Sequence, residues 1–236
     1  MSRRPELVEN GFRVRVKTRS SAWNESSLAS IDVSVRNALC AGPYFEAQAY
    51  WARRHFRQFL VVVADTLNIH NYIGLGHPVY GRLEPEDARE IAFREGDSWI
   101  AGHADRAVRI LGKDRLHITR WDDLMQRDEY AATLAAYRHL HQSSERFANA
   151  VARESAAYCR RKGYGEEEAQ AAAPQLVDYL LEDAAVSQVL AQSRAVSIYP
   201  GSVALPLRFS AADGFAADAR RQYVHLQIGP LEPSPA

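Results

Sequence analysis

The chain has few cysteines and no long apolar run. Only Cys40 and Cys159 are present among its 236 residues, so there is no disulfide framework of the kind that small secreted domains use. The longest apolar run, at residues 59–64, is too short to span a bilayer. No apolar segment follows Arg3 and Arg4, so no signal peptide is indicated. We therefore expect a cytoplasmic protein with no membrane role.

Nucleotide and metal motifs are also missing. Gly74-Leu75-Gly76 begins like a dinucleotide fingerprint, but Pro78 follows it and the third glycine is absent. There is no P-loop and no G-x-S-x-G elbow of the α/β-hydrolases. The eight histidines nowhere show the spacing of metal ligands. The sequence predicts neither a cofactor nor a metal.

Charge is balanced overall but divided along the chain. There are 29 basic and 29 acidic residues, of which residues 1–120 hold 18 basic and 14 acidic. This modest polarity permits a phosphate-binding face without requiring one.

The order of apolar patterns predicts one α/β domain over residues 1–236, with residues 1–11 and 230–236 flexible. Strands are expected at 12–19, at the edge of the sheet with a basic face, and at 31–34, 60–64, 115–121 and 195–199. Helices are expected at 41–59, 84–111, 122–163 and 165–190, the last kinked or restarted at Pro174, and a loop at 66–80. Alternating strands and helices indicate a Rossmann-like, mostly parallel sheet with helices on both faces.

One serine stands where such a sheet binds ligands. Ser34 ends the short strand after Ile31, and Asp65 ends the next strand, so both belong to the carboxyl edge of the sheet. Ser34 is our candidate nucleophile, although most serines before a helix only cap it. Cys40 is a rival nucleophile, and its plainer interpretation is a small buried apolar residue.

A later helix carries a second candidate group. Tyr179, Glu182 and Asp183 are three and four residues apart, which puts them on neighbouring faces of one helix. Such a group can hold an ammonium ion and pass on its proton. The alternative interpretation is a solvated acidic helix face with a half-buried tyrosine.

Taken in order, these pieces resemble the cyclodipeptide synthases, enzymes that take two aminoacyl-tRNAs and release a diketopiperazine. The resemblance covers most of residues 30–200. It rests on the following stretches of the sequence: Ile31-x-Val33-Ser34-x-x-Asn37, Phe45-Glu46-Ala47 with Trp51, Val62 to Tyr72, Tyr179 with Asp183, and Tyr199-Pro200. It implies a fold like the catalytic core of class I aminoacyl-tRNA synthetases.

The resemblance also implies a ping-pong mechanism. Ser34 would take the first aminoacyl group, the second aminoacyl-tRNA would supply an amine that gives a dipeptidyl enzyme, and attack by the terminal amine would release the product. Tyr179 with Asp183 or Glu182 would hold the ammonium group, and Tyr199 would position the serine. The residues expected to bind substrate are Val33, Asn37, Val62, Ala64, Asp65 and Pro200. Those expected to contact tRNA are Arg53, Arg54, Arg57, Arg106 and Arg109.

The sequence departs from the family pattern at three points. The family usually has glutamate four residues after the helix tyrosine, where this chain has Asp183, with Glu182 one residue earlier; either could serve, and we favour Asp183. Asn37 together with Tyr199-Pro200 mixes two subgroups, and the proline favours the Tyr-Pro type. Residues 80–115, where the family often has a basic helix, hold seven basic and eight acidic residues.

Two other functions stay open from the sequence. One is a non-catalytic tRNA-binding Rossmann-like module, and the other is an atypical serine hydrolase. The HIGH and KMSKS signatures of synthetases are absent, which argues against ATP-dependent activation. We expect a monomer by default, and the sequence does not indicate which two amino acids are joined.

Overall fold

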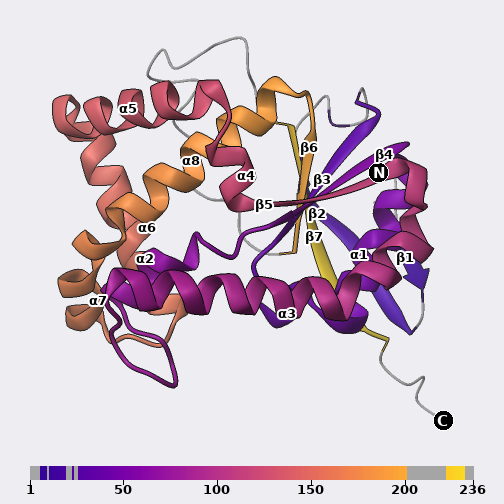
Figure 1. The fold of residues 1–236 in the computed structure, drawn as a ribbon, viewed down its shortest axis with the longest axis horizontal. Helices are drawn as coiled ribbons and strands as arrows, with labels where there is room; N and C mark the ends of the chain where they lie inside the picture. The colour runs from indigo at the N-terminus through magenta and orange to yellow at the C-terminus, as the bar shows by residue number, and fades with distance from the viewer. Residues whose placement is uncertain (1–5, 10, 20–22, 24–25, 201–221, 232–236) are drawn as a thin grey trace.

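A computed structural model describes residues 6–9, 11–19, 23, 26–200 and 222–231. Its centre is a seven-stranded sheet in the order β1-β2-β7-β6-β3-β4-β5 (Figure 1). The strands are β1 (Glu6–Glu9), β2 (Phe12–Arg19), β3 (Leu28–Val33), β4 (Gln58–Val63), β5 (Leu116–Arg120), β6 (Val196–Tyr199) and β7 (Gln222–Pro230). Strands β7, β6, β3, β4 and β5 pair in parallel. At one side of the sheet β2 pairs antiparallel with β7, and β1 pairs antiparallel with β2. The predicted mostly parallel α/β fold is confirmed.

Helices connect the strands and cover both faces of the sheet (Figure 1). The α-helices are α1 (Gly42–His55), α2 (Asn68–Gly74), α3 (Pro85–Leu111), α4 (Trp121–Met125), α5 (Asp128–Ser143), α6 (Glu145–Arg161), α7 (Glu166–Ala172) and α8 (Val177–Gln192). Short 3-10 helices in the described part of the chain include η2 (Ala38–Cys40), η3 (Lys113–Arg115) and η4 (Ala173–Leu176). Helices α1 and α3 pack on one face, and the α4, α5, α6 and α8 group packs on the other. None of the helices in the described residues is long and apolar enough to cross a membrane.

The strand predictions need three corrections. β2 is not an edge strand, because β1 pairs with its outer side, although Arg13, Arg15 and Lys17 are exposed on it as expected. Residues 6–9 belong to β1 instead of a flexible end, since four residues are too few to show a period of two. β7 was not predicted at all, and it separates β2 from β6.

The helix predictions also differ in detail. Residues 68–74 form α2 where a loop was expected, because Gly74 and Gly76 suggest a turn and seven residues carry little periodicity. The helical stretch 122–163 is three helices, the last of which begins where the Ser144 side chain accepts a hydrogen bond from the Phe147 amide. Pro174 lies in η4, between α7 and α8, so of the two effects expected there, a kink or a restart, the structure has a restart.

Strand alternation sends successive side chains to opposite faces of the sheet. From β3, Ala29, Ile31 and Val33 enter the core under α1 and α3, and from β4, Val61 and Val63 do the same. Leu60 and Val62 belong to the second core, under α8. This alternation decides where each polar residue at the strand ends points.

Candidate active site

A pocket of about 320 Å³ opens at the carboxyl edge of the parallel strands. Ser34, one residue past β3, lines it, and so do Ala64 after β4 and Pro200 after β6. Ser34 is the first residue of a tight turn, in which its carbonyl accepts a hydrogen bond from the Asn37 amide at 2.9 Å. The structure therefore brings the candidate serine to the edge where an open α/β sheet binds ligands.

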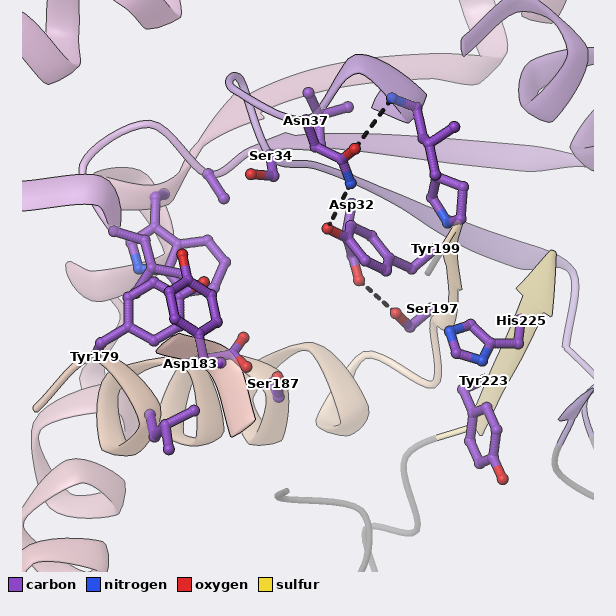
Figure 2. A pocket seen from close by; sticks show the side chains of 18 of the residues that line it. Asp32, Ser34, Asn37, Tyr179, Asp183, Ser187, Ser197, Tyr199, Tyr223 and His225 are labelled. Atoms are coloured by element: carbon purple, nitrogen blue, oxygen red, sulfur yellow. Dashed lines mark hydrogen bonds between the residues drawn. The ribbon is translucent and has the colours of Figure 1, made fainter. Parts of the chain in front are cut away.

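Helix α8 supplies the opposite wall. Tyr179 and Asp183 are one turn apart and both line the pocket. Figure 2 shows them facing Ser34 and Asn37 across the cavity. The predicted tyrosine and carboxylate thus share one cavity with the serine, although Ser34 and Tyr179 are 145 positions apart in the chain.

Glu182 points elsewhere. Its carboxylate accepts a hydrogen bond from the Trp121 indole Nε1 at 2.9 Å and lies 3.0 Å from His70 Nε2. The residue is buried at 9% exposure and does not line the pocket. Of the two candidate carboxylates, Asp183 is the one in the cavity, and Glu182 ties α8 to α2 and α4.

Asn37 connects two walls of the pocket. Its amide nitrogen donates to the Tyr199 hydroxyl at 3.0 Å, and its amide oxygen accepts from the Leu39 amide at 3.0 Å (Figure 2). The second bond caps η2. The first bond fixes the phenol of β6 beside the turn that holds Ser34, so the Tyr-Pro strand and the serine turn are held together.

Tyr179 and Tyr199 keep their protons at neutral pH. Burial raises the pKa of Tyr179 well above its usual value, and the neighbouring Tyr158 and Asp183 add to the shift. The Tyr158 and Tyr179 rings lie 5.2 Å apart. Burial also raises the pKa of Tyr199. These phenols are therefore neutral hydrogen-bond donors and not phenolates.

Cys40 is a poor nucleophile. The thiol is fully buried, and burial raises its pKa to about 12, a shift that the Asp32 carboxylate increases. Almost none of the thiol is ionised to thiolate at neutral pH.

No group of three or more His, Cys, Asp or Glu side chains within the described ranges is arranged to hold a metal ion.

Two residues expected to bind substrate lie away from the pocket. Val62 is fully buried in the core under α8. Asp65 is fully buried too, and its carboxylate accepts two bonds from the Arg120 guanidinium, at 2.7 and 2.5 Å. The alternation of side chains along an extended segment explains the direction of Asp65. Because Ala64 faces the pocket, the next residue, Asp65, points to the opposite face of the sheet, toward Gly96 of α3. The remaining expected residues, Val33, Asn37, Ala64 and Pro200, line the pocket.

The arginines proposed for tRNA do not surround the pocket. Arg53, Arg54 and Arg57 are exposed near the start of β4, where the Arg57 amide donates to Ser27 ahead of β3. This is the amino edge of the sheet, one strand length or about 20 Å from Ser34. Arg106, which pairs with Glu46, and Arg109 lie in the last turns of α3, toward the same edge.

The sequence analysis missed a group of cations beside the pocket, which we call the rim cations: Arg36, Arg161 and Lys162. Arg161 lines the cavity, and the charged groups of Arg161 and Lys162 lie 5.7 and 5.4 Å from the centre of the Tyr158 ring. Burial lowers the pKa of Lys162, and Arg36 and Arg161 lower it further. The run Arg160-Arg161-Lys162 is visible in the sequence as a basic cluster, but only the fold places this cluster near Arg36.

Comparisons with known proteins agree with this architecture. The family model described as "Cyclodipeptide synthase" matches residues 12–225, so the chain belongs to the cyclodipeptide synthase family, whose members are enzymes that make cyclodipeptides. No curated protein matches the chain by sequence.

Among solved structures, a cyclodipeptide synthase from Fluoribacter dumoffii is similar at a TM-score of 0.75 with 17% identity, over 94% of this chain and all of the other. A cyclodipeptide synthetase of Mycobacterium tuberculosis, described as related to type I tRNA synthetases, is similar at 0.70 with 19% identity, over 98% and 99%. Tyrosyl-tRNA synthetase from Archaeoglobus fulgidus is similar at 0.50 with 10% identity, over 89% of this chain and 60% of that one. At these identities the structural matches support the fold alone.

Proposed function

We propose that this cyclodipeptide synthase takes both amino acids from aminoacyl-tRNAs and joins them by a ping-pong mechanism through acylated Ser34. The observation that carries the proposal is the position of Ser34 across one cavity from Tyr179 and Asp183. An aminoacyl-tRNA is already an activated ester, so transfer to a serine hydroxyl exchanges one ester for another. A Ser-His-Asp triad is not needed for such an exchange.

The first step loads the serine. Ser34 Oγ attacks the ester carbonyl carbon of the first aminoacyl-tRNA, the bond to the tRNA 3′-terminal ribose oxygen breaks, and the serine proton leaves with that oxygen. The ammonium group of the bound residue lies between the neutral Tyr179 phenol and the Asp183 carboxylate. A carboxylate and a phenol oxygen both accept hydrogen bonds from an ammonium group, so this wall orients the substrate.

The second step lengthens the acyl group. The sequence-based expectation that the second aminoacyl-tRNA supplies the attacking amine would free Ser34 and leave a dipeptidyl-tRNA. A dipeptidyl enzyme instead requires that the deprotonated amine of the Ser34-bound residue attack the ester carbonyl of the second aminoacyl-tRNA. That attack forms the peptide bond, the bond to the ribose oxygen of the second tRNA breaks, and this oxygen leaves with the proton lost by the amine. The amine of the second residue becomes the new terminal amine.

The third step closes the ring. The new terminal amine attacks the Ser34 ester carbonyl, the ester bond breaks, and the serine oxygen regains a proton while the diketopiperazine leaves. Both reacting groups belong to one tethered chain, which gives the attack a high effective molarity. Tyr179, with its proton retained, can pass a proton from the amine to the serine oxygen. Tyr199, held by Asn37, positions the serine turn.

The rim cations support a tRNA substrate. Arg161 lines the opening that holds Ser34, where it pairs with Glu154, and Lys162 adds a positive charge over the Tyr158 ring, where the phosphates of a 3′ end would pass. Arg53, Arg54, Arg57, Arg106 and Arg109 are about a strand length away, so in this proposal they meet other parts of the tRNA. Tyr199-Pro200 favours the Tyr-Pro subgroup.

Production of cyclodipeptides in a bacterial host tests the proposal. Cells that express the protein should release diketopiperazines detectable by mass spectrometry, and cells that express Ser34→Ala at the same soluble level should release none. Purified enzyme should then make the same product from two aminoacyl-tRNAs without ATP. Release of free amino acids only would support an esterase instead. Tight tRNA binding with neither product would support a binding module.

A further inference from the structure

The loop between α2 and α3 presents an exposed aromatic ring. The loop projects from the molecule between these two helices (Figure 1). Among the described residues, its Val79 and Tyr80 are the most exposed of the large hydrophobic side chains, at 75% and 56%. Exposed side chains on loops that a rigid scaffold supports are often binding residues. The catalytic steps use neither of the two.

The loop has a defined backbone shape. Gly76 and Gly81 have φ angles of +97° and +72°, which favour glycine, and the ring of Pro78 restricts the backbone between them. The His77 amide donates to the Gly81 carbonyl at 2.7 Å, and the Gly81 amide donates to the His77 carbonyl at 2.8 Å. The loop is therefore closed by its own backbone hydrogen bonds.

The His77 ring supports Tyr80 inside this loop. The two rings are stacked, with centroids 4.8 Å apart and an angle of 20° between their planes; we call them the ring platform. His77 is buried, and its Nδ1 accepts hydrogen bonds from the backbone amides of Val79 and Tyr80 at 3.1 and 3.4 Å. Because His77 covers one face of the Tyr80 ring, the exposed surface of Tyr80 lies on the other face and at the edge.

Arg36 connects the ring platform with the serine turn. Arg36 belongs to the turn from Ser34 to Asn37. Its Nη1 atom lies 2.7 Å from His77 Nε2 and donates to a Glu95 oxygen at 2.8 Å. One side chain thus reaches from the turn that holds the candidate nucleophile to the base of the stacked rings.

The end of α6 borders the same loop. The Tyr164 hydroxyl, which follows the rim cations in the chain, donates to the Leu75 carbonyl at 3.2 Å. The rim cations therefore lie between the ring platform and the pocket, since Arg36 contacts His77 and Arg161 lines the cavity. Their charge is partly balanced, because Arg36 pairs with Glu95 and Arg161 pairs with Glu154. An uncharged contact would add to the limited attraction that they offer to RNA.

The distance from Ser34 to the ring platform suits a tRNA 3′ end. Two residues of backbone, one extended arginine side chain and one ring stack add up to at most about 20 Å. A tRNA ends in about four unpaired nucleotides, each of which advances about 3.4 Å when stacked and about twice that when extended, so the strand covers about 14–27 Å. With the terminal ribose at Ser34, an unpaired base can therefore reach Tyr80.

We propose that the ring platform binds the single-stranded 3′ end of the aminoacyl-tRNA by stacking one of its unpaired bases on Tyr80. The inference rests on the proposed function and adds a binding residue for the RNA part of the substrate. Single-stranded RNA ends are commonly bound by stacking on aromatic side chains. Every base has a π face, and the 3′ end is common to all tRNAs, so this contact serves both substrates whichever amino acids they carry.

Binding of deacylated tRNA tests the proposal without any chemistry. Dissociation constants are measured for an intact tRNA and for the same tRNA trimmed of its unpaired 3′ nucleotides. Tyr80→Ala should weaken binding of the intact tRNA about tenfold, and Tyr80→Phe, which keeps the ring, should stay within about twofold of wild type. Wild type and Tyr80→Ala should bind the trimmed tRNA equally, because the base that stacks is absent.

Two control variants separate stacking from other causes. Val79→Ala changes the neighbouring exposed side chain of the same loop and should leave binding of the intact tRNA unchanged. Lys162→Gln removes a charge, so the slope of log affinity against log salt should fall by about one. Tyr80→Ala removes no charge and should leave that slope unchanged. Thermal unfolding checks that each variant is folded.

The outcomes separate this inference from the function beneath it. If wild-type protein binds no intact tRNA, the proposed use of aminoacyl-tRNA is wrong. The proposed function stands and the ring platform is wrong if Tyr80→Ala binds intact tRNA as wild type does, or loses as much affinity for the trimmed tRNA. Equal losses in Val79→Ala and Tyr80→Ala would also contradict stacking. Self-association that Tyr80→Ala abolishes, with tRNA binding unchanged, would assign the ring to a protein contact instead.

Discussion

Glu182 and Asp183 are neighbours in the chain, yet their carboxylates serve different parts of the molecule. Glu182 accepts a hydrogen bond from Trp121 in the core, and Asp183 lines the cavity that holds Ser34. Successive residues of a helix point about 100° apart, so the distinction follows from the helix itself. Sequence spacing alone allowed either carboxylate to act.

This relationship predicts opposite effects for two matched variants. Asp183→Asn should lower kcat/KM for cyclodipeptide formation about 100-fold or more, because the ammonium group loses its charged partner. Glu182→Gln should keep activity within about threefold but cost about 1–3 kcal/mol of stability, since a buried charged hydrogen bond is weakened. Product formation and urea denaturation of both proteins measure this. The assignment is wrong if Glu182→Gln is the inactive variant and Asp183→Asn is not.

The hydrogen bond between Asn37 and Tyr199 predicts coupled effects. Tyr199→Phe removes the hydroxyl, and Asn37→Asp keeps the oxygen that caps η2 but removes the amide donor. Each should reduce the rate of Ser34 acylation, and the double variant should lose less than the product of the two reductions. We expect a coupling energy of about 1 kcal/mol, within the range found for residues in contact. Strict additivity would show that the bond does not position the serine turn.

Two glycines of α3 form a matched pair for stability. A Cβ on Gly96 would stand 2.8 Å from the Cβ of Asp65 and would overlap the Asp65–Arg120 ion pair, whereas a Cβ on Gly102 would meet nothing within 4 Å. Gly96→Ala should therefore destabilise the fold by about 2–4 kcal/mol. Gly102→Ala should stabilise it by up to about 1 kcal/mol through helix propensity. Equal midpoints of denaturation for the two variants would contradict the close packing at Gly96.

Cys40 should not react with alkylating agents in the native protein and should not be needed for activity. Because burial raises its pKa to about 12, well above the ordinary value of 9.0, the thiolate fraction stays negligible from pH 7 to pH 10. Native protein should resist iodoacetamide at Cys40 over that range, and unfolding in urea should make it react. Cys40→Ala should retain cyclodipeptide synthesis. Rapid alkylation of native protein at pH 8 together with lost activity would restore Cys40 as a nucleophile.

The sequence predicted the central strand β4 well because that strand is buried on both faces. Residues 60–64 form an apolar run with three successive valines, which is typical of such a strand, and β4 indeed has five buried residues in succession. The prediction omitted β7, whose pattern at Gln222–Pro230 mixes polar pocket residues with apolar core residues. Val224, Leu226 and Ile228 alternate with Tyr223, His225 and Gln227, which is the period-two pattern of a strand, so the signal was present in the sequence and was overlooked.

Side-chain direction limited what could be predicted about the site. Asp65 and Ser34 both follow strand ends, and the sequence grouped them together. Alternation places Ser34 on the pocket side but turns Asp65 toward α3 and Arg120. The rim cations were missed for a different reason, because Arg36 and Lys162 are far apart in the chain and meet only through the tertiary fold.

Direct detection of acylated Ser34 tests the central claim most sharply. Enzyme mixed with one labelled aminoacyl-tRNA is quenched in acid within seconds, digested, and mapped by mass spectrometry. We predict one aminoacyl ester, located at residue 34, absent from Ser34→Ala and lost when a second aminoacyl-tRNA is added before the quench. Label at another residue, or cyclodipeptide formed by Ser34→Ala at the wild-type rate, would contradict the account.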